Sequence, residues 1–244
     1  MVKENPASRL YNLLELADKN SPDTTFRVAW AKVFKVEPAD TPALLHRYSN
    51  MLDLYVLTKN YILETPRLSN DRNLAFINKI GDSINHISLN GNISNFKNNL
   101  NSEALTALYY LSDNISLIHN LEDSIVTDDQ ISELIKEVDT LISHITVSDL
   151  TTDIKQILVK NLHIIRESLH CYFILGIEGV QTALEQSLGS LIMHNQDIRP
   201  EVEDENVKGV FKFMSRLNEI ISIANGVKDL IAPITQFLLL SKSS

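Results

Sequence analysis

Apolar residues recur along this chain at intervals of three and four, the spacing of one face of an α-helix. In the first third, prolines mark the helix ends: Asn5-Pro6 starts a helix, Ser21-Pro22 breaks the chain, and a later helix runs from Thr41-Pro42 to Thr65-Pro66. The apolar stripes between these points are Leu10, Leu13, Leu14 and Ala17, then Phe26, Ala29, Trp30, Val33 and Phe34, then Leu45, Tyr48, Leu52, Tyr55 and Ile62. We therefore predict three short helices forming a compact N-terminal unit over residues 1–66.

The same spacing continues through residues 67–244, which we predict to form a larger helical bundle. Asn90-Gly91 indicates a turn, which we interpret as part of a helix–turn–helix rather than of a β-hairpin, because the flanking residues do not alternate. Thr127-Asp128-Asp129-Gln130 has the pattern of a capping box at a helix start. After Ser148 no strong helix breaker occurs before Asn195, so residues 150–192 are predicted to form one long central helix, bent near Gly176 or Gly179.

The C-terminal part begins with an acidic segment over residues 197–206, which is predicted to be an exposed linker. The last helix then becomes apolar on every side after Pro233. Fully burying such side chains contributes about 1.5–3 kcal/mol each, so we expect them to dock on a hydrophobic surface, either of the same bundle or of another subunit. Self-association is the favoured alternative, and the interacting residues are predicted to be Ile234, Phe237, Leu238 and Leu240.

Composition supports an all-α fold, because hydrophobic residues make up 44% of the chain while glycine and proline number only seven each. The net charge is −9, and its acidity lies mainly in residues 127–200, which carry 5 basic and 11 acidic side chains. Proteins that bind the DNA backbone concentrate Lys and Arg, so generic DNA binding is not expected. We also expect no cofactor, since no nucleotide-binding motif occurs.

Location follows from what the chain lacks. The first residues contain no apolar core of a signal peptide, and no stretch reaches the roughly 18 uncharged apolar residues that a spanning helix needs. The single cysteine, Cys171, lies in an apolar run and is expected to be a buried, unreactive thiol. A cytoplasmic protein is therefore predicted.

The most distinctive polar group is a strip of His163, Arg166, Glu167 and His170, which share one helix face at positions i, i+3, i+4 and i+7. Helical ribonucleases of the HEPN class place an Arg and a His a few residues apart on one helix, and Arg166 with His170 is a candidate catalytic pair for such a metal-independent ribonuclease. Only three residues separate Arg166 from His170, whereas the familiar spacing is four to six, so this sequence does not match the HEPN pattern.

The same strip offers a metal alternative. Glu167 and His170 form one Glu-x-x-His motif, but a di-iron bundle needs a second, and no other histidine has Glu three residues before it. A single metal ion held by His163, Glu167 and His170 is the remaining metal hypothesis. The simpler interpretation, which we favour, is a solvated strip whose charges pair with one another.

Two segments resemble an uncharacterised all-helical family of bacterial proteins: Ala29-Trp30-x-x-Val33-Phe34, and Gly176-x-Glu178-Gly179 followed by Ala183-Leu184-Glu185-x-x-Leu188-Gly189. The resemblance implies a helical bacterial protein from defence-related gene neighbourhoods, and it transfers no active site. We therefore predict a non-enzymatic interaction or regulatory protein, an accessory component of a bacterial antiviral defence or toxin–immunity system. The alternatives are the ribonuclease and a membrane-interacting effector that uses the C-terminal helix, whose polar face carries Lys208, Lys212, Arg216 and Lys228.

Overall fold

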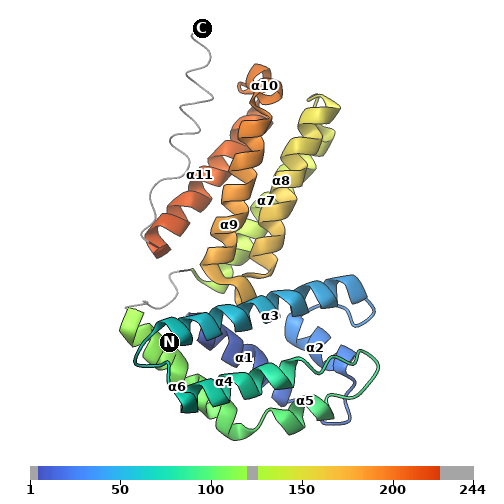
Figure 1. Ribbon diagram of the computed structural model, residues 1–244. Coiled ribbons are helices and arrows are strands. Elements are labelled where there is room, and N and C mark those ends of the chain that lie inside the picture. Colours follow the sequence, from blue (N-terminus) through green and yellow to red (C-terminus); the bar gives the residue numbers. More distant parts are fainter. Residues whose placement is uncertain (1–4, 120–125, 226–244) are drawn as a thin grey trace. The chain divides into compact units, whose positions relative to one another are not determined.

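The computed structural model describes residues 5–119 and 126–225, and this part of the chain is helical, with no strand (Figure 1). The all-α prediction is confirmed. The chain divides into two compact units, residues 1–123 and 124–244, and each is described here by itself. This boundary differs from the predicted one at residue 66, for a reason that the packing of the first unit makes clear.

The first unit contains six helices in its described part: α1 (Pro6–Asp18), α2 (Phe26–Phe34), α3 (Thr41–Glu64), α4 (Asp71–Ile84), α5 (Ser94–Asn99) and α6 (Ser102–His119). The three predicted N-terminal helices are present, but they do not close a core alone. Helix α1 packs against α6 as well as against α2 and α3, and α4 packs against α3, α5 and α6. The apolar stripe of α1 is buried, α6 is one of the helices packed on α1, and the first unit accordingly extends to residue 123.

Trp30 lies at the centre of an aromatic cluster that holds the short helices in place. Its ring is fully buried, 5.3 Å from the ring of Phe34 on α2 and 5.1 Å from that of Tyr48 on α3. Phe96 of α5 meets it edge-on at 5.3 Å, which anchors a helix too short to be stable by itself. The loops before α2 and α5 are joined by the backbone bonds Phe26 N to Gly91 O and Ile93 N to Thr24 O, both 2.8 Å. The turn predicted at Asn90-Gly91 thus connects two helices, as expected.

Asn5 both starts α1 and ties it to α6. Its side-chain oxygen accepts from the backbone N–H of Ser8 at 3.0 Å, and the Ser8 hydroxyl in turn accepts from the Asn5 backbone N–H at 2.9 Å. The Asn5 amide nitrogen donates to the Ser112 carbonyl at 2.9 Å and to the Ser116 hydroxyl at 2.7 Å, both on α6. Because Asn5 is fully buried, one side chain satisfies polar groups of two helices that are far apart in the sequence.

Gly81 lets α3 approach α4 closely. A Cβ atom at this position would lie 2.3 Å from the Tyr55 hydroxyl oxygen and 2.8 Å from its Cζ. Tyr55 therefore occupies the space that a side chain would need. Burial and the nearby Asp82 carboxylate raise the pKa of Tyr55 above its ordinary value.

The second unit is a four-helix bundle built from α7 (Asp128–Val147), α8 (Thr152–His170), α9 (Tyr172–Met193) and α11 (Glu205–Asn225). Helix α7 packs on α8, α8 on α9, α9 on α11, and α11 back on α7, with short connections between successive helices (Figure 1). The core contains apolar residues from all four helices, among them Val138, Leu158, Leu162, Ile165, Leu184, Leu188, Phe213 and Leu217.

The predicted long central helix is wrong: residues 150–192 form two helices that run side by side, α8 and α9. Helix α8 ends at His170, and within α9 Gly176 has φ 64° and ψ −165°, a backbone conformation that side chains disfavour. The bend predicted near Gly176 is thus a reversal of the chain. The apolar run at this point is explained by the turn, since Leu169 and Tyr172 both belong to the core of the second unit.

The acidic segment at residues 197–206 is a short connection between α9 and α11. It contains α10 (Asn195–Ile198) and the 3-10 turn η1 (Arg199–Glu201), and Ile198 is buried in the bundle core. Glu203 and Glu205 are exposed. The segment therefore closes the bundle rather than separating two domains.

Candidate functional site

The predicted polar strip lies on the solvent side of α8. Two of its residues, Arg166 and Glu167, interact with different neighbours. Arg166 reaches across to α7, where its Nε lies 2.6 Å from a carboxylate oxygen of Asp139. Both side chains are well exposed, at 38% and 47%, so this ion pair contributes little to stability. Arg166 thus pairs with a neighbouring helix, whereas the predicted pairings lay within the strip. A ribonuclease that used Arg166 would have to break the pairing with Asp139.

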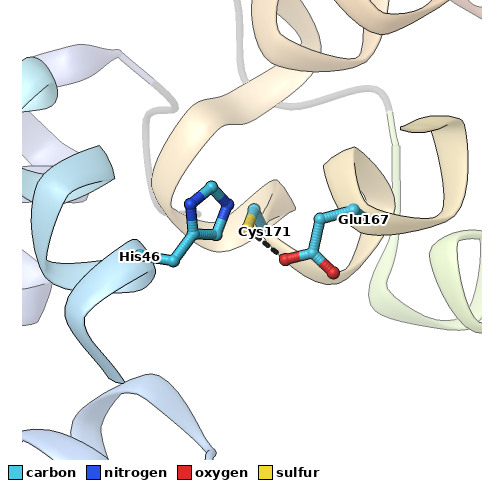
Figure 2. Close-up of side chains that lie close together, drawn as sticks. All are labelled: His46, Glu167 and Cys171. Carbon is cyan, nitrogen blue, oxygen red and sulfur yellow. Dashed lines mark hydrogen bonds between the residues drawn. The ribbon is translucent and has the colours of Figure 1, made fainter. Parts of the chain in front are cut away.

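Glu167 interacts with a residue at the end of its own helix. Its carboxylate accepts a hydrogen bond from the Cys171 thiol at a sulfur–oxygen distance of 3.6 Å (Figure 2). Cys171 is buried, as expected for a cysteine in an apolar run. His46, also drawn in Figure 2, belongs to α3 of the first unit.

The metal hypothesis requires that three ligand atoms converge. Within neither unit do three described His, Cys, Asp or Glu side chains bring their ligand atoms within 4.8 Å of one another. His163, Glu167 and His170 share a helix face, as predicted, but the structure does not gather their ligand atoms into such a group.

Of the four basic residues that suggested membrane contact, Lys208 and Arg216 are engaged with acidic neighbours, Lys212 is exposed, and Lys228 lies outside the described residues. Lys208 lies 3.2 Å from Glu203 and 3.3 Å from Glu205, and Arg216 lies 2.6 Å from Glu137 of α7. No helix within the described ranges is long and apolar enough to cross a membrane. The predicted interaction residues Ile234, Phe237, Leu238 and Leu240 lie outside the described residues.

A pocket of about 940 Å³ lies in the first unit, between the first half of α4 and the second half of α6. The turn after α3 closes one side. From that turn and α4 it is lined by Thr65, Pro66, Arg67, Leu68, Arg72, Asn73 and Phe76, and from α6 by Ala107, Tyr110, Leu111, Asn114, Leu117 and Ile118. Its volume is in the range of sites that hold a small molecule or the side chains of a partner protein. We call it the α4–α6 pocket.

The apolar side chains around this pocket differ in exposure. Leu68 and Leu111 are buried, with exposed fractions of 5% and 4%, and belong to the protein core. In contrast, Leu117 is 68% exposed, Tyr110 is 61% exposed, and Ile118 is 36% exposed. An apolar rim over a buried apolar floor is typical of a surface that a partner covers.

Among the residues that the structure describes, two arginines are the only charged ones that line the α4–α6 pocket. The Arg72 guanidinium lies over the ring of Phe76, with its central carbon 5.9 Å from the ring centre. Neither Arg67 nor Arg72 forms an ion pair with another residue in the described part of the chain, and both are exposed. The described lining of this pocket therefore carries positive charge, although the chain as a whole is acidic.

Aromatic residues extend this surface from α6 onto α1. The rings of Tyr110 and Tyr109 lie 5.6 Å apart, and Tyr109 meets the ring of Tyr11 edge-on at 5.5 Å. Tyr11 donates a hydrogen bond to Glu15 at 3.1 Å; burial, followed by this bond, raises its pKa. Tyrosines in such a row offer rigid contact area with a polar end, a composition enriched at protein interfaces.

This pocket does not follow from the sequence patterns. A signal was present in α6, where apolar and aromatic residues occupy more than one helix face: Leu108, Leu111 and Ile115 on the buried side, and Tyr110, Leu117 and Ile118 away from it. A helix packed on one side needs only one such stripe. The second stripe is the part that faces the pocket.

Comparison of the chain with models of known families, with curated proteins and with solved structures finds no match.

Proposed function

We propose that this chain is a non-enzymatic interaction protein and that the α4–α6 pocket is where its protein partner docks. The observation that carries the proposal is the apolar rim. Leu117 and Tyr110 keep more than half of their surface in water. A partner that buried them would gain roughly 1.5–3 kcal/mol for each such side chain, before the costs of association.

The chemistry of the lining supports binding rather than catalysis. In the described part of the chain, the lining side chains include arginines, asparagines and a threonine, but no His, Cys, Asp or Glu. General acid–base catalysis usually relies on one of those groups, or on a lysine or tyrosine with a shifted pKa. Arginine and tyrosine, which the pocket does offer, are the residues that most often dominate binding energy at protein interfaces.

The role in a bacterial defence or toxin–immunity system extends this proposal to a biological setting. Its support is the resemblance of two sequence segments, around Trp30 and around Gly176, to bacterial helical proteins. The partner would then be another protein of the same system, and the chain would act by occupying or releasing it.

The test is photo-cross-linking in cells of the source organism. A photoreactive amino acid is introduced at Leu117, and in a matched control at Val28, which is 46% exposed and lies on α2 outside the pocket lining. We expect a discrete protein adduct from position 117 and none from position 28. The same partner should no longer co-purify with the Leu117→Asp variant, and unchanged Trp30 fluorescence would show that the variant is folded. Equal adducts from both positions, or none from position 117, would contradict the proposal.

A further inference from the structure

We infer that the α4–α6 pocket selects an amphipathic helix whose apolar stripe is flanked by aspartate or glutamate. The inference rests on the proposed function and adds the chemistry of the partner. It combines three observations on the described residues: the length of the apolar rim, the two arginines without a carboxylate partner, and the lack of an acidic residue in the lining.

The length follows from α6. Its lining residues run from Ala107 to Ile118 on one helix face, which at 1.5 Å per residue spans roughly 16 Å. This is the length of three helical turns. A partner helix of about 11 residues, with apolar side chains at i, i+3 or i+4, and i+7, would lie along the whole rim. Such a helix would cover Tyr110 and Leu117 together.

The charge preference follows from Arg67 and Arg72. Two arginines of the second unit are matched by carboxylates: Arg166 lies 2.6 Å from Asp139, and Arg216 lies 2.6 Å from Glu137. The two pocket arginines have no such partner among the described residues and stand at the edge of an apolar surface. Carboxylates on the flank of a docked helix would complete these pairs, and a basic flank would be repelled.

Nucleic acid is a weaker fit to the same residues, although tyrosine and arginine also stack on bases. A nucleic-acid strand presents one phosphate per nucleotide, and its binding sites follow the backbone with a track of basic side chains. Here two arginines stand at one part of a pocket whose other part is formed by Leu111, Leu117 and Ile118. Residues 1–123 carry 12 Lys and Arg against 14 Asp and Glu, so the unit as a whole would not attract a polyanion.

The first experiment is a selection from a displayed peptide library. Helix-forming peptides of about 12 residues keep a fixed apolar stripe, and their flanking positions are randomised. The bait is the full-length chain, with Leu117→Asp as the counter-selection. We expect Asp and Glu to be enriched at the flanks on the wild type. We expect no acidic enrichment on the double variant Arg67→Gln/Arg72→Gln.

The second experiment measures affinity by fluorescence anisotropy, using the best acidic peptide and its Glu→Gln counterpart. Each exposed ion pair contributes modestly, so the double variant should weaken the acidic peptide roughly 3- to 10-fold and leave the Gln peptide within about 2-fold. The difference should shrink as salt is raised. Lys160→Gln/Lys212→Gln is the control for net charge, since both lysines are exposed and lie in the second unit. It should change neither affinity.

The outcomes separate the inference from the proposed function. Helical peptides that bind without acidic enrichment, or that respond equally to both double variants, would overturn the charge preference and leave the docking function standing. If the wild type enriched no peptide over Leu117→Asp, the inference would fail, and cross-linking from position 117 would then decide separately on the function.

Other occupants are tested in the same assay. The inference of a foreign acidic helix would be overturned if a peptide with the sequence of residues 226–244 displaced the selected peptide. It would also be overturned if the full-length chain formed dimers that Arg67→Gln/Arg72→Gln dissociates, or if a labelled oligoribonucleotide bound and lost affinity in that variant.

Discussion

The replacement of Asn5 by alanine should destabilise the first unit far more than the loss of an ordinary helix cap. The Asn5 side chain accepts one hydrogen bond at the start of α1 and donates two to α6, to the Ser112 carbonyl and the Ser116 hydroxyl. Alanine would remove all three bonds and leave the α6 groups buried without this donor. We therefore expect the effect to exceed that of the cap alone.

The magnitude can be estimated from the three bonds. Loss of an Asn cap costs about 1 kcal/mol, and each lost buried hydrogen bond costs about 1 kcal/mol more. Asn5→Ala should therefore lower the free energy of unfolding by about 3 kcal/mol. Asn70→Ala is the matched control, because Asn70 caps α4 through the Asn73 N–H at 3.0 Å but is exposed. That variant should lose only about 1 kcal/mol.

Urea unfolding followed by Trp30 fluorescence measures both variants in the same unit, since Trp30 is the single tryptophan of the chain. Asn5→Asp adds a second test. It keeps the oxygen that caps α1 but loses both donors to α6, so it should be less stable than Asn70→Ala. Equal losses for Asn5→Ala and Asn70→Ala would refute the role assigned to the bonds between α1 and α6.

Three further predictions concern the rest of the molecule. In urea unfolding, Gly81→Ala should change the free energy of unfolding at least 1 kcal/mol less favourably than Gly189→Ala. A Cβ at position 81 meets a tyrosine of α3, whereas one at position 189 meets nothing within 4 Å and gains about 1 kcal/mol of helix propensity. Trp30 fluorescence should report the unfolding of the first unit only. Far-UV circular dichroism should show a second transition, the unfolding of the second unit, with a different midpoint. Total RNA incubated with the chain should stay intact at every concentration; cleavage abolished by Arg166→Ala or His170→Ala would instead support the ribonuclease alternative.

Helix starts were the most predictable part of this fold because their signals are local. Asn5-Pro6 and the capping box at Thr127 were identified from the sequence, and both form the expected bonds. The Thr127 hydroxyl accepts from the Gln130 N–H at 3.2 Å, and the Gln130 side chain accepts from the Thr127 N–H at 2.9 Å. A cap involves residues within one turn, so the sequence carries all the information that is needed.

The chain reversal after α8 was less predictable because its cause is not local. Gly176 is compatible with a continuous helix, a bend or a turn, and the apolar residues around it suit a central helix as well as a packed corner. What selects the turn is the gain from packing α8 against α9. The same applies to the unit boundary, since the need of α1 for α6 cannot be inferred from either helix alone.

The polar strip could be predicted from the sequence and the α4–α6 pocket could not. In both cases the limit is that packing between helices cannot be inferred from one helix. Spacing correctly placed His163, Arg166, Glu167 and His170 on one face of α8, but spacing within a helix does not reveal what a neighbouring helix supplies. Asp139 of α7 supplies the carboxylate to Arg166, in an exposed ion pair between two helices. The four residues share the predicted face, and one of them, Arg166, pairs with a neighbouring helix rather than within the strip.

The pocket could not be predicted from the sequence, because each of its residues, taken alone, is an ordinary core or surface residue. Leu117 and Tyr110 on a helix suggest core, and they become informative only when the structure shows that both line the α4–α6 pocket and remain exposed. Arg67 and Arg72 suggest surface, and they become informative only when no carboxylate lies beside them among the described residues. A binding surface of this kind is defined by what the fold leaves uncovered and uncompensated. It therefore follows from packing between helices, which the apolar spacing of a single helix does not encode.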